Sequence, residues 1–544
     1  MKRLLGAALF TMWATSAAAS TTVFLGGAIY TENDKQPWAS ALVVRDGRIA
    51  YVGSDAGAGR FIDKQTRVIR LHGRMMLPGF HDAHAHPMSA SLRFLRCRLG
   101  GKTTRAALFS AIRACAAAHA DAAWLVGYEY PSKAFEKNPV TRAELDALVP
   151  DRPAYIANET GFSAWVNSRA LAAAGIDPAS NSSGLISDEV LDRVHAKIPH
   201  PTETEYRAAL KLWTAKANAF GITSVFDAAA SPPMVAAYHA ADLAGELNLR
   251  VVAAQLVDPK RGSDQVDEMV RRRVGARGDR FRADAAKIFL DGEIDQHTAA
   301  LLAPYADAPK GSGALFLQSD ALNALVQRLD REGFLIHIHV MGDAAVRAGL
   351  DAYENAIAAN GAKDRRHQLA HVALADPSDI ARFGALGVTA NFSPGWFRVE
   401  DPALPGTEAA LGPERATRLY PAASVAARRG RIVMSSDWPA TSMNPLDGIE
   451  AAVTRQAPRG AVPSLQPQNR VDLATALAAY TKNAAWAARE DEIDGTLEVG
   501  KAADLVVLDK NLFRIDAAAI HAVRVVLTLV NGGPTYLDKT SGWR

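Results

Sequence analysis

Runs of apolar, β-branched residues alternate with alanine-rich stretches through the middle of the chain. Such runs are typical of strands buried on both faces, and the stretches between them are long enough for crossover helices. Eight buried strands separated by helices are the pattern of an α/β fold, the (β/α)8 or TIM barrel. The eight predicted strands are 79–83, 222–227, 250–256, 285–290, 334–339, 367–371, 388–392 and 431–436.

Both ends of the chain differ from the middle, because they carry short β-rich runs. Asp46-Gly47 supplies a tight hairpin turn between two of them. Neither end is sufficient to form a domain alone, so we expect 20–75 and 495–544 to pair into one small β-domain, with the barrel spanning 76–494. The predicted runs are 23–30, 41–45, 48–53 and 67–71 near the N-terminus, and 496–498, 503–508 and 523–531 near the C-terminus.

The first two predicted barrel strands are separated by many more residues than a crossover requires. This stretch, about 88–220, contains extra strand-like pieces at 124–128 and 154–158. We interpret it as an insertion after the first barrel strand that lies over the barrel mouth, where it can shape a substrate pocket.

Composition excludes several classes of protein. The 544 residues are 49% hydrophobic and 22% charged, so the chain can bury a large core and is neither disordered nor fibrous. The formal net charge is only +3, which does not favour nucleic acid or an anionic membrane surface as a partner.

The first nineteen residues are typical of a secretory signal peptide. Met1-Lys2-Arg3 is a basic start, 4–14 is an apolar stretch, and Ala17-Ala18-Ala19 is a small-residue cleavage site. An uncleaved anchor helix is the alternative, but the apolar stretch is shorter than the roughly 20 residues that span a bilayer. We therefore predict an exported protein, periplasmic or secreted, without stable membrane association after cleavage.

Cys97 and Cys115 are the two cysteines of the chain. Their spacing matches no zinc-ribbon pattern, and two cysteines are too few for a disulfide scaffold. In an oxidising compartment they can form a strand-to-helix disulfide, and two buried free thiols are the alternative. The sequence leaves both open.

His84 and His86 stand two residues apart at the end of the first predicted strand. Side chains two apart in a strand point the same way, so both imidazoles can hold one metal ion. Three more candidate ligands end or follow later strands: His339, His371 and Asp437. The carboxyl ends of barrel strands meet on the face where barrel active sites form, so these residues predict a metal site there.

Lys287 lies in the fourth predicted strand and points into the same cluster. An ammonium group beside a dication is repelled and loses its proton readily. Reaction of the amine with carbon dioxide would give a carbamate, an anionic oxygen ligand that can bridge two metal ions. The alternative is an ordinary strand lysine paired with Asp291 or Asp284, and the spacing alone leaves both open.

Six motifs follow one another along the chain: PGFHDAHAHP, KIFLDG, HVMGDAAV, RHQLAHV, SSDWP and GTLEVGKAADLVVLD. Together they resemble the amidohydrolase superfamily of metal-dependent hydrolases, in the branch that includes N-substituted formamide deformylase. The resemblance implies a barrel joined to a β-sandwich that both termini form. It also implies two metal ions with a carboxylated lysine, Lys287, between them. The first ion would be held by His84, His86 and Asp437, and the second by His339 and His371.

The predicted activity is hydrolysis of an amide-type carbon–nitrogen bond in a small organic molecule by metal-activated hydroxide, because a metal ion lowers the pKa of its bound water. Asp437 is the predicted catalytic residue, which accepts the proton of the attacking hydroxide and passes it to the departing nitrogen. Zinc is the default ion for a histidine-rich set completed by oxygen, with iron, manganese or cobalt as alternatives and one or two ions per chain.

The same ligand set leaves other functions open. Hydroxide attack on a cyclic amide, a carbamate or an ester would use the same site. A non-catalytic metal-binding or regulatory protein on this fold is a further alternative, which the complete ligand set opposes. The sequence is compatible with a homo-oligomer.

Two departures from the family pattern fall where pocket walls are expected. Phe162 stands in an insertion motif where the branch commonly has a histidine, and His297 lies in 293–298, where small residues and arginine are usual. Trp396 and Trp438 lie near other strand ends and can add an aromatic wall, although core packing explains each equally well. These four residues are the predicted substrate contacts.

Two further residues are predicted to support the ligands. His337 has the strand parity of His339 but lies one step deeper, which is typical of a core histidine or one that orients a ligand. Asp343 is predicted to cap the helix after the fifth strand or to orient a ligand from behind.

Overall fold

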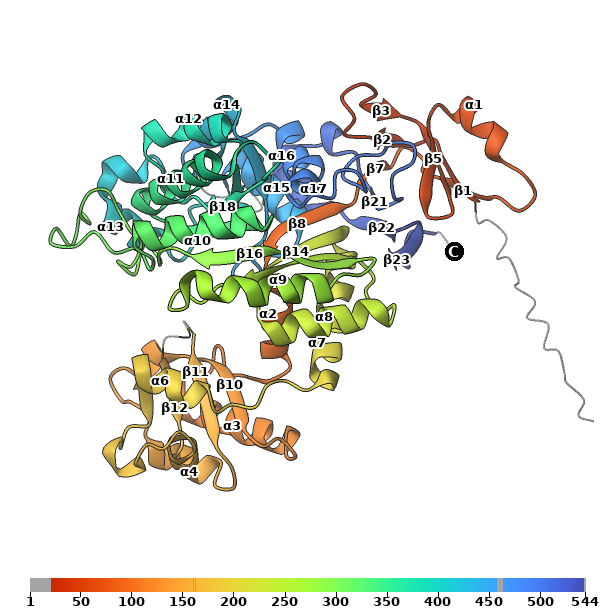
Figure 1. The fold of residues 1–544 in the computed structure, drawn as a ribbon. Coiled ribbons are helices and arrows are strands. Elements are labelled where there is room, and N and C mark those ends of the chain that lie inside the picture. Colours follow the sequence, from red (N-terminus) through yellow and green to blue (C-terminus); the bar gives the residue numbers. More distant parts are fainter. Residues whose placement is uncertain (1–20, 160, 162, 457–462, 543–544) are drawn as a thin grey trace, which may run out of the picture.

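The computed structural model describes residues 21–159, 161, 163–456 and 463–542. In that part of the chain, one parallel sheet of eight strands runs in sequence order and forms the barrel (Figure 1). The predicted barrel is confirmed, and the largest difference is that the fourth strand begins at Phe281. The strands are β8 (Phe80–Ala85), β14 (Ile222–Ala230), β15 (Arg250–Leu256), β16 (Phe281–Phe289), β17 (Leu335–Val340), β18 (Gln368–His371), β19 (Thr389–Phe392) and β20 (Arg431–Met434).

Backbone hydrogen bonds join the barrel where its first strand, β8, meets the turn after its last strand, β20. The N–H of Asp437 donates to the carbonyl of His84 at 2.8 Å. The N–H of His86 donates to the carbonyl of Trp438, also at 2.8 Å. The backbone itself therefore brings three of the predicted ligands to one place.

Helices cover the outside of the barrel, and local signals set their ends. A capping box between Thr202 and Glu205 begins α7. Asp376 accepts the N–H of Ser378 at the start of α12, which ends at Gly387, where φ is 65°. The helices are α7 (Glu203–Ala219), α8 (Pro232–Leu243), α9 (Val266–Gly275), α10 (Ser319–Arg331), α11 (Asp343–Asn360), α12 (Pro377–Leu386), α13 (Leu404–Ala416), α14 (Ala422–Ala427), α15 (Pro445–Thr454), α16 (Leu473–Tyr480) and α17 (Lys482–Ala487).

Two sheets that share one buried core form the β-domain, in which Phe24 of one sheet and Leu505 of the other belong to the same apolar cluster. The first sheet, as described, has the order β5-β4-β1-β6, and the second has the order β23-β22-β21-β7-β2-β3. The strands are β1 (Thr21–Leu25), β2 (Ala28–Tyr30), β3 (Trp38–Ala39), β4 (Ala41–Arg45), β5 (Arg48–Gly53), β6 (Arg67–Arg70), β7 (Met75–Pro78), β21 (Leu505–Leu508), β22 (Val525–Val530) and β23 (Gly533–Leu537); a short helix, α1 (Asp55–Ala58), follows β5.

The predicted pairing of the two ends of the chain is confirmed, because β7 and β21 form an antiparallel ladder. Residues 496–498, predicted as a strand, are irregular instead. Leu497 donates its N–H to the carbonyl of Thr31 at 2.8 Å. Together with the hydrogen bond that Asn33 Nδ2 donates to Glu498 Oε1 at 3.0 Å, this contact holds the segment without extending a sheet.

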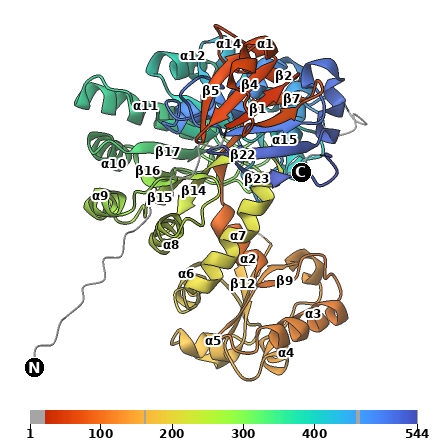
Figure 2. The ribbon, with the colours of Figure 1, turned by 90° about the vertical axis from the view of Figure 1, so that its right-hand side faces the viewer.

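The insertion forms a lobe that α2 (Pro87–Phe94) and α7 connect to the barrel (Figure 2). Its described sheet has the order β13-β12-β11-β10-β9. Cys97 in β9 and Cys115 in α3 form a disulfide with their Cα atoms 5.7 Å apart, which decides between the two alternatives left by the sequence. The elements are β9 (Cys97–Arg98), α3 (Arg105–Ala118), β10 (Leu125–Tyr130), α4 (Arg142–Leu148), β11 (Ala154–Asn158), β12 (Ser163–Val166), α5 (Ser168–Ala173), β13 (Leu185–Ser187) and α6 (Asp188–His195).

The predicted signal peptide, residues 1–19, lies outside the described residues. Within the part of the chain that the structure describes, no helix has the length and apolar character that crossing a bilayer requires. The described residues belong to the barrel, the β-domain and the inserted lobe.

Candidate metal centre

Three of the predicted ligands meet where β8 approaches the turn after β20. The Nε2 atom of His84 lies 3.4 Å from Oδ1 of Asp437, and Nε2 of His86 lies 3.3 Å from the same oxygen. One ligand atom from each residue lies within 4.8 Å of the other two. The spacing of two residues along an extended backbone sends both imidazoles to the same side, as predicted.

His339 and His371 lie beside this group, near the ends of the neighbouring strands β17 and β18. Their ring centroids are 4.6 Å apart, and the His371 ring is 4.7 Å from the His84 ring. The carboxyl ends of the barrel strands therefore bring the five predicted histidine and aspartate ligands into one cluster.

Lys287 of β16 is fully buried beside this cluster, and its Nζ has no hydrogen-bond partner within the described residues. The two carboxylates considered as alternative partners are engaged elsewhere. Asp284 binds Arg282 at 2.8 Å, and Asp291 accepts hydrogen bonds from three backbone N–H groups. Burial lowers the pKa of Lys287 to about 7, so the neutral amine is accessible near neutral pH.

Burial also keeps three histidines of the cluster, His84, His339 and His371, neutral. It lowers the pKa of His339 to about 3, and the pKa values of His84 and His371 fall well below 6.5, with neighbouring positive charges adding to the effect. A neutral imidazole has the free lone pair that binds a metal ion.

The donor atoms of the cluster fit a divalent metal ion. The buried atoms His84 Nε2, His371 Nδ1 and Lys287 Nζ have no hydrogen-bond partner in the described part of the chain. A buried polar atom without a partner is costly, and metal ions bound in the cluster would satisfy all three. Several nitrogen donors completed by a carboxylate are typical of sites for zinc and related transition metals.

His337 lies behind the cluster and contacts a ligand directly. Its Nε2 lies 2.8 Å from Nδ1 of His84, which leaves Nε2 of His84 facing Asp437. The His337 ring stacks on Phe226, with 4.9 Å between the ring centroids. A hydrogen bond to the far nitrogen of a histidine fixes its tautomer and its ring orientation. This position suits the supporting role predicted for His337.

Asp82 also holds the site together, although the sequence reasoning did not single it out. Its Oδ1 accepts the N–H of Ser436 at 2.9 Å, and its Oδ2 accepts the Ser436 hydroxyl. This contact fixes the residue immediately before Asp437. Strand parity could have found Asp82, because Asp82, His84 and His86 alternate along one face of the strand.

Asp291 has a larger role beside His339 than the sequence suggested. It joins the loops after β16 and β17 by accepting hydrogen bonds at 2.9 Å from Ala300, Met341 and Gly342. Its Oδ1 lies 3.9 Å from Nε2 of His339. Asp343 begins α11, and its carboxylate accepts the N–H of Leu302 at 2.8 Å, so it braces the same loop rather than a ligand.

Two of the ligands have a left-handed backbone. The φ angle is 75° at His371 and 47° at Asp437. This conformation costs a residue other than glycine roughly 1–2 kcal/mol and persists only where the surrounding contacts impose it. Such strain clusters at functional sites, in agreement with the position of both residues.

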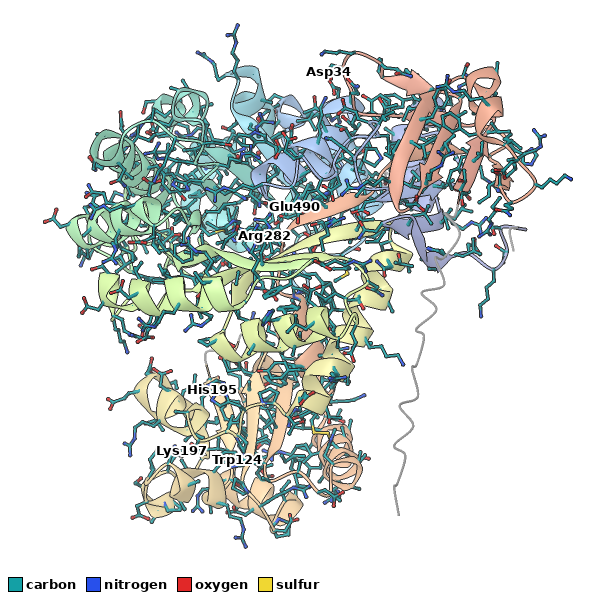
Figure 3. All side chains as sticks on the ribbon, turned by 45° about the vertical axis from the view of Figure 1, so that its right-hand side comes forward. Asp34, Trp124, His195, Lys197, Arg282 and Glu490 are labelled. Atoms are coloured by element: carbon teal, nitrogen blue, oxygen red, sulfur yellow. A yellow bond between two sulfur atoms is a disulfide. The ribbon has the colours of Figure 1, made fainter. Side chains whose placement is uncertain are left out.

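A cleft of about 890 Å³ lies between the barrel mouth and the insertion, and residues from both line it. His195 is one of the insertion residues, and Figure 3 labels it on the side of the lobe nearest the barrel. The barrel contributes four of the predicted metal ligands to the lining: His86, His339, His371 and Asp437.

The predicted substrate contacts have different positions. Trp396 lines the cleft. Trp438 is 5% exposed and belongs to the barrel core. His297 pairs with Asp307 at 2.7 Å, so the loop presents other side chains to the cleft. Phe162 lies outside the described residues.

A second group with metal-ligand residue types lies nearer the amino-terminal end of the barrel strands. His81 Nε2 lies 3.1 Å from Asp494 Oδ1 and His81 Nδ1 lies 3.6 Å from Glu490 Oε2. Arg250 lies 3.4 Å from Asp494, and Arg282 lies 3.8 Å from Glu490. Figure 3 labels Arg282 and Glu490, which lie near each other. Because the guanidinium groups neutralise the carboxylates, we interpret this group as an ion network that joins the barrel to the C-terminal segment.

Comparison with known proteins finds relatives over nearly the whole chain. Protein LONG AFTER FAR-RED 3 of Arabidopsis thaliana is 27% identical over 94% of this chain and 90% of its own. N-substituted formamide deformylase of Arthrobacter pascens is 26% identical over 93% of this chain and 96% of its own. The fold is similar to that of an uncharacterized metal-dependent hydrolase from Pyrococcus furiosus, with a TM-score of 0.76 and 24% identity over 90% of this chain and 99% of that one. Residues 67–536 match the sequence profile of the amidohydrolase family, and the chain belongs to that family, as its motifs indicated.

Proposed function

We propose that this protein hydrolyses an amide-type carbon–nitrogen bond in a small organic molecule. The observation that carries the proposal is the convergence of buried, unpartnered nitrogen donors and a carboxylate beside one cleft. The cleft volume of about 890 Å³ suits a small molecule. We assign His84, His86 and Asp437 to one ion, His339 and His371 to the other, and Lys287 as the bridging residue.

A divalent ion held by these residues supplies an activated water nucleophile at neutral pH and polarises the substrate carbonyl. Asp437 lines the cleft within 3.4 Å of His84 and His86, so its carboxylate is placed to accept a proton from the attacking water. The same carboxyl group then returns that proton to the departing nitrogen. His337 orients His84 throughout.

Lys287 is proposed to carry a carbamate. Its neutral Nζ forms a bond to the carbon of carbon dioxide, one C=O π bond becomes an anionic oxygen, and the nitrogen releases a proton to solvent. The buried position and unpartnered Nζ of Lys287 support this assignment. Zinc is the proposed ion, with iron, manganese and cobalt as alternatives.

The same groups would also serve hydrolysis of a cyclic amide, a carbamate or an ester, because each presents a carbonyl to the same nucleophile. A non-catalytic metal-binding or regulatory protein would need the same ligands but no cleft beside them, whereas Asp437 lines the cleft. We therefore rank catalysis first.

We further propose that the protein is exported to the periplasm or secreted. The basic, apolar and small-residue pattern of 1–19 supports this proposal. The disulfide between Cys97 and Cys115 also supports it, because disulfides persist in oxidising compartments.

The test is turnover of N-formyl amines, N-acyl amino acids, cyclic amides and simple esters by chelator-stripped and zinc-reconstituted protein. Amine release that requires the metal supports the proposal. Asp437→Asn is the control: it should reduce kcat by more than about a thousandfold with the circular dichroism spectrum unchanged. Full turnover by this variant would remove Asp437 from the mechanism, and metal binding without any turnover would favour the non-catalytic alternative.

A further inference from the structure

Three carboxylates line one side of the cleft: Glu293 and Asp295 in the loop after β16, and Asp401 before α13. Two aromatic rings line the cleft with them. The ring centroids of Trp396 and Tyr420 are 6.5 Å apart, with 29° between their planes. We call these five residues the acidic side of the cleft.

The acidic side borders the metal centre. The ring of Trp396 lies 5.3 Å from the ring of His371, one of the assigned ligands. A group bound there would therefore belong to the molecule whose carbonyl lies at the metal centre.

The protein itself leaves the charge of the acidic side largely uncompensated. Within the described residues, the carboxylates of Glu293 and Asp295 form neither an ion pair nor a hydrogen bond. The carboxylate of Asp401 accepts the N–H of Ala403 at 3.1 Å. Arg398 is a cation whose charge reaches Asp401, but it does not line the cleft.

The charges of all three carboxylates reach the Tyr420 hydroxyl. Burial raises the pKa of Tyr420, and the charges of Asp401, Glu293 and Asp295 raise it further. Burial likewise raises the pKa of Glu293 to about 8, with Asp437, Asp295, Asp291 and Asp401 adding to the effect. Tyr420 is 5% exposed, and its hydroxyl has no hydrogen-bond partner in the described part of the chain. Like charges gathered near the unpartnered hydroxyl of a buried side chain that lines the cleft indicate a site that a cation completes.

On the insertion side of the cleft, two of the carboxylates have partners within the protein. Glu129 pairs with Arg98 at 3.1 Å. Glu159 accepts hydrogen bonds from the N–H and the hydroxyl of Ser132 at 2.9 and 3.1 Å. Asp192 is a third carboxylate that lines the cleft on this side, but Arg93 and Arg98 line it there as well. The insertion side therefore presents charges of both signs, and the cation preference belongs to the barrel side.

We infer that the acidic side binds a protonated amine or a guanidinium, and that the amide hydrolysed at the metal centre carries this cationic group. The inference rests on the proposed function and names the substrate class of that site. A cation would form charge-assisted hydrogen bonds with Glu293 and Asp295. The faces of Trp396 and Tyr420 add cation–π attraction. A neutral substrate of the same shape would leave the partly buried carboxylates without a partner and would be disfavoured.

The experiment compares two amides of equal length, N-acetyl-1,5-diaminopentane and N-acetylhexylamine, in which an ammonium replaces a methyl group. With zinc-loaded protein, we expect kcat/KM to be about tenfold or more higher for the cationic amide. The double variant Glu293→Gln with Asp295→Asn should bring this ratio close to one. Glu129→Gln, the same chemical change at the carboxylate paired with Arg98, should leave the ratio unchanged. Metal content and circular dichroism confirm that each variant is folded and loaded.

A binding measurement separates this inference from the proposed function. Calorimetry of both amides with zinc-loaded Asp437→Asn protein needs no turnover. Tighter binding of the cationic amide, lost in the triple variant that adds Glu293→Gln and Asp295→Asn, supports the acidic side as a cation site even if neither amide is hydrolysed. Equal binding of the two amides, or equal kcat/KM in the wild type, overturns the inference and leaves the proposed hydrolysis standing.

Discussion

Replacing Cys115 by serine is expected to loosen the insertion without loosening the barrel. The disulfide joins β9 to α3, and its two cysteines are 18 residues apart in sequence. A cross-link that closes a loop of this length stabilises the lobe by about 3 kcal/mol, because it restricts the unfolded chain. The insertion has an apolar core of its own, which includes Leu108, Leu145 and Trp165, so the loss should fall on this lobe.

Each 1.4 kcal/mol corresponds to a factor of ten, so the loss raises the equilibrium constant for opening the lobe by about 150-fold. Amide hydrogen exchange measures this constant where closing is faster than exchange. We expect the amides of β10 and β11 to exchange about 150-fold faster in Cys115→Ser than in the oxidised wild type, and those of β16 and β17 to exchange at the same rate in both.

Reduced wild-type protein is the matched control, because it lacks the same bridge and should exchange like the variant. Unchanged protection of β10 in the variant would refute the reasoning about chain entropy. Equal acceleration in β16 and β17 would refute the independence of the lobe. Arg98 and Tyr128 line the cleft from β9 and β10, so we also expect a raised KM in the variant with a smaller change in kcat.

Three further predictions concern the metal centre and the ion network. Lys287→Ala should lower bound metal and turnover together, with partial recovery on adding short carboxylic acids; full metal occupancy of the variant would contradict the bridging role. His337→Phe keeps a ring but removes the hydrogen bond to His84, so metal affinity in a competition titration should fall by about 10–100-fold, and an unchanged affinity would exclude the orienting role. Burial alone would lower the pKa of His81, but Asp494 and the other carboxylates near it raise the pKa above 6.5. Protonated His81 therefore stabilises the fold fully below that pH, and this contribution is lost as the pH rises through the raised pKa. His81→Gln should therefore reduce the free energy of unfolding in urea more at about pH 5.5 than at about pH 9, whereas an equal reduction at both would contradict the linkage.

The barrel and the convergence of the candidate ligands could be predicted because both depend on local patterns. The period of apolar runs indicated the strands, and strand ends alone placed His339 and His371 on one face. The chemistry of each residue type then limited what the cluster can bind.

Features that depend on contacts between distant segments could not be predicted. The side chains of Trp438 and His297 lie in turns, where direction depends on packing against other elements, and neither residue lines the cleft. His81 and Asp494 are far apart in sequence, and no local pattern indicates that they meet. Tyr420 could not be predicted as part of the site, because its hydroxyl matters only through its proximity to carboxylates from two other segments.

The backbone contacts between β8 and the turn after β20 have a consequence for the order of assembly. His84 and His86 come from the first barrel strand, whereas Asp437 follows the last one, so this ligand group does not exist until nearly the whole barrel has been synthesised and has folded. A nascent or translocating chain offers only the adjacent pair of histidines, which is a much weaker chelator than the complete set. Under the proposed export, with the chain crossing the membrane unfolded, metal capture would be deferred to the destination, and the supply of ions in that compartment, rather than in the cytoplasm, would decide which metal the protein carries.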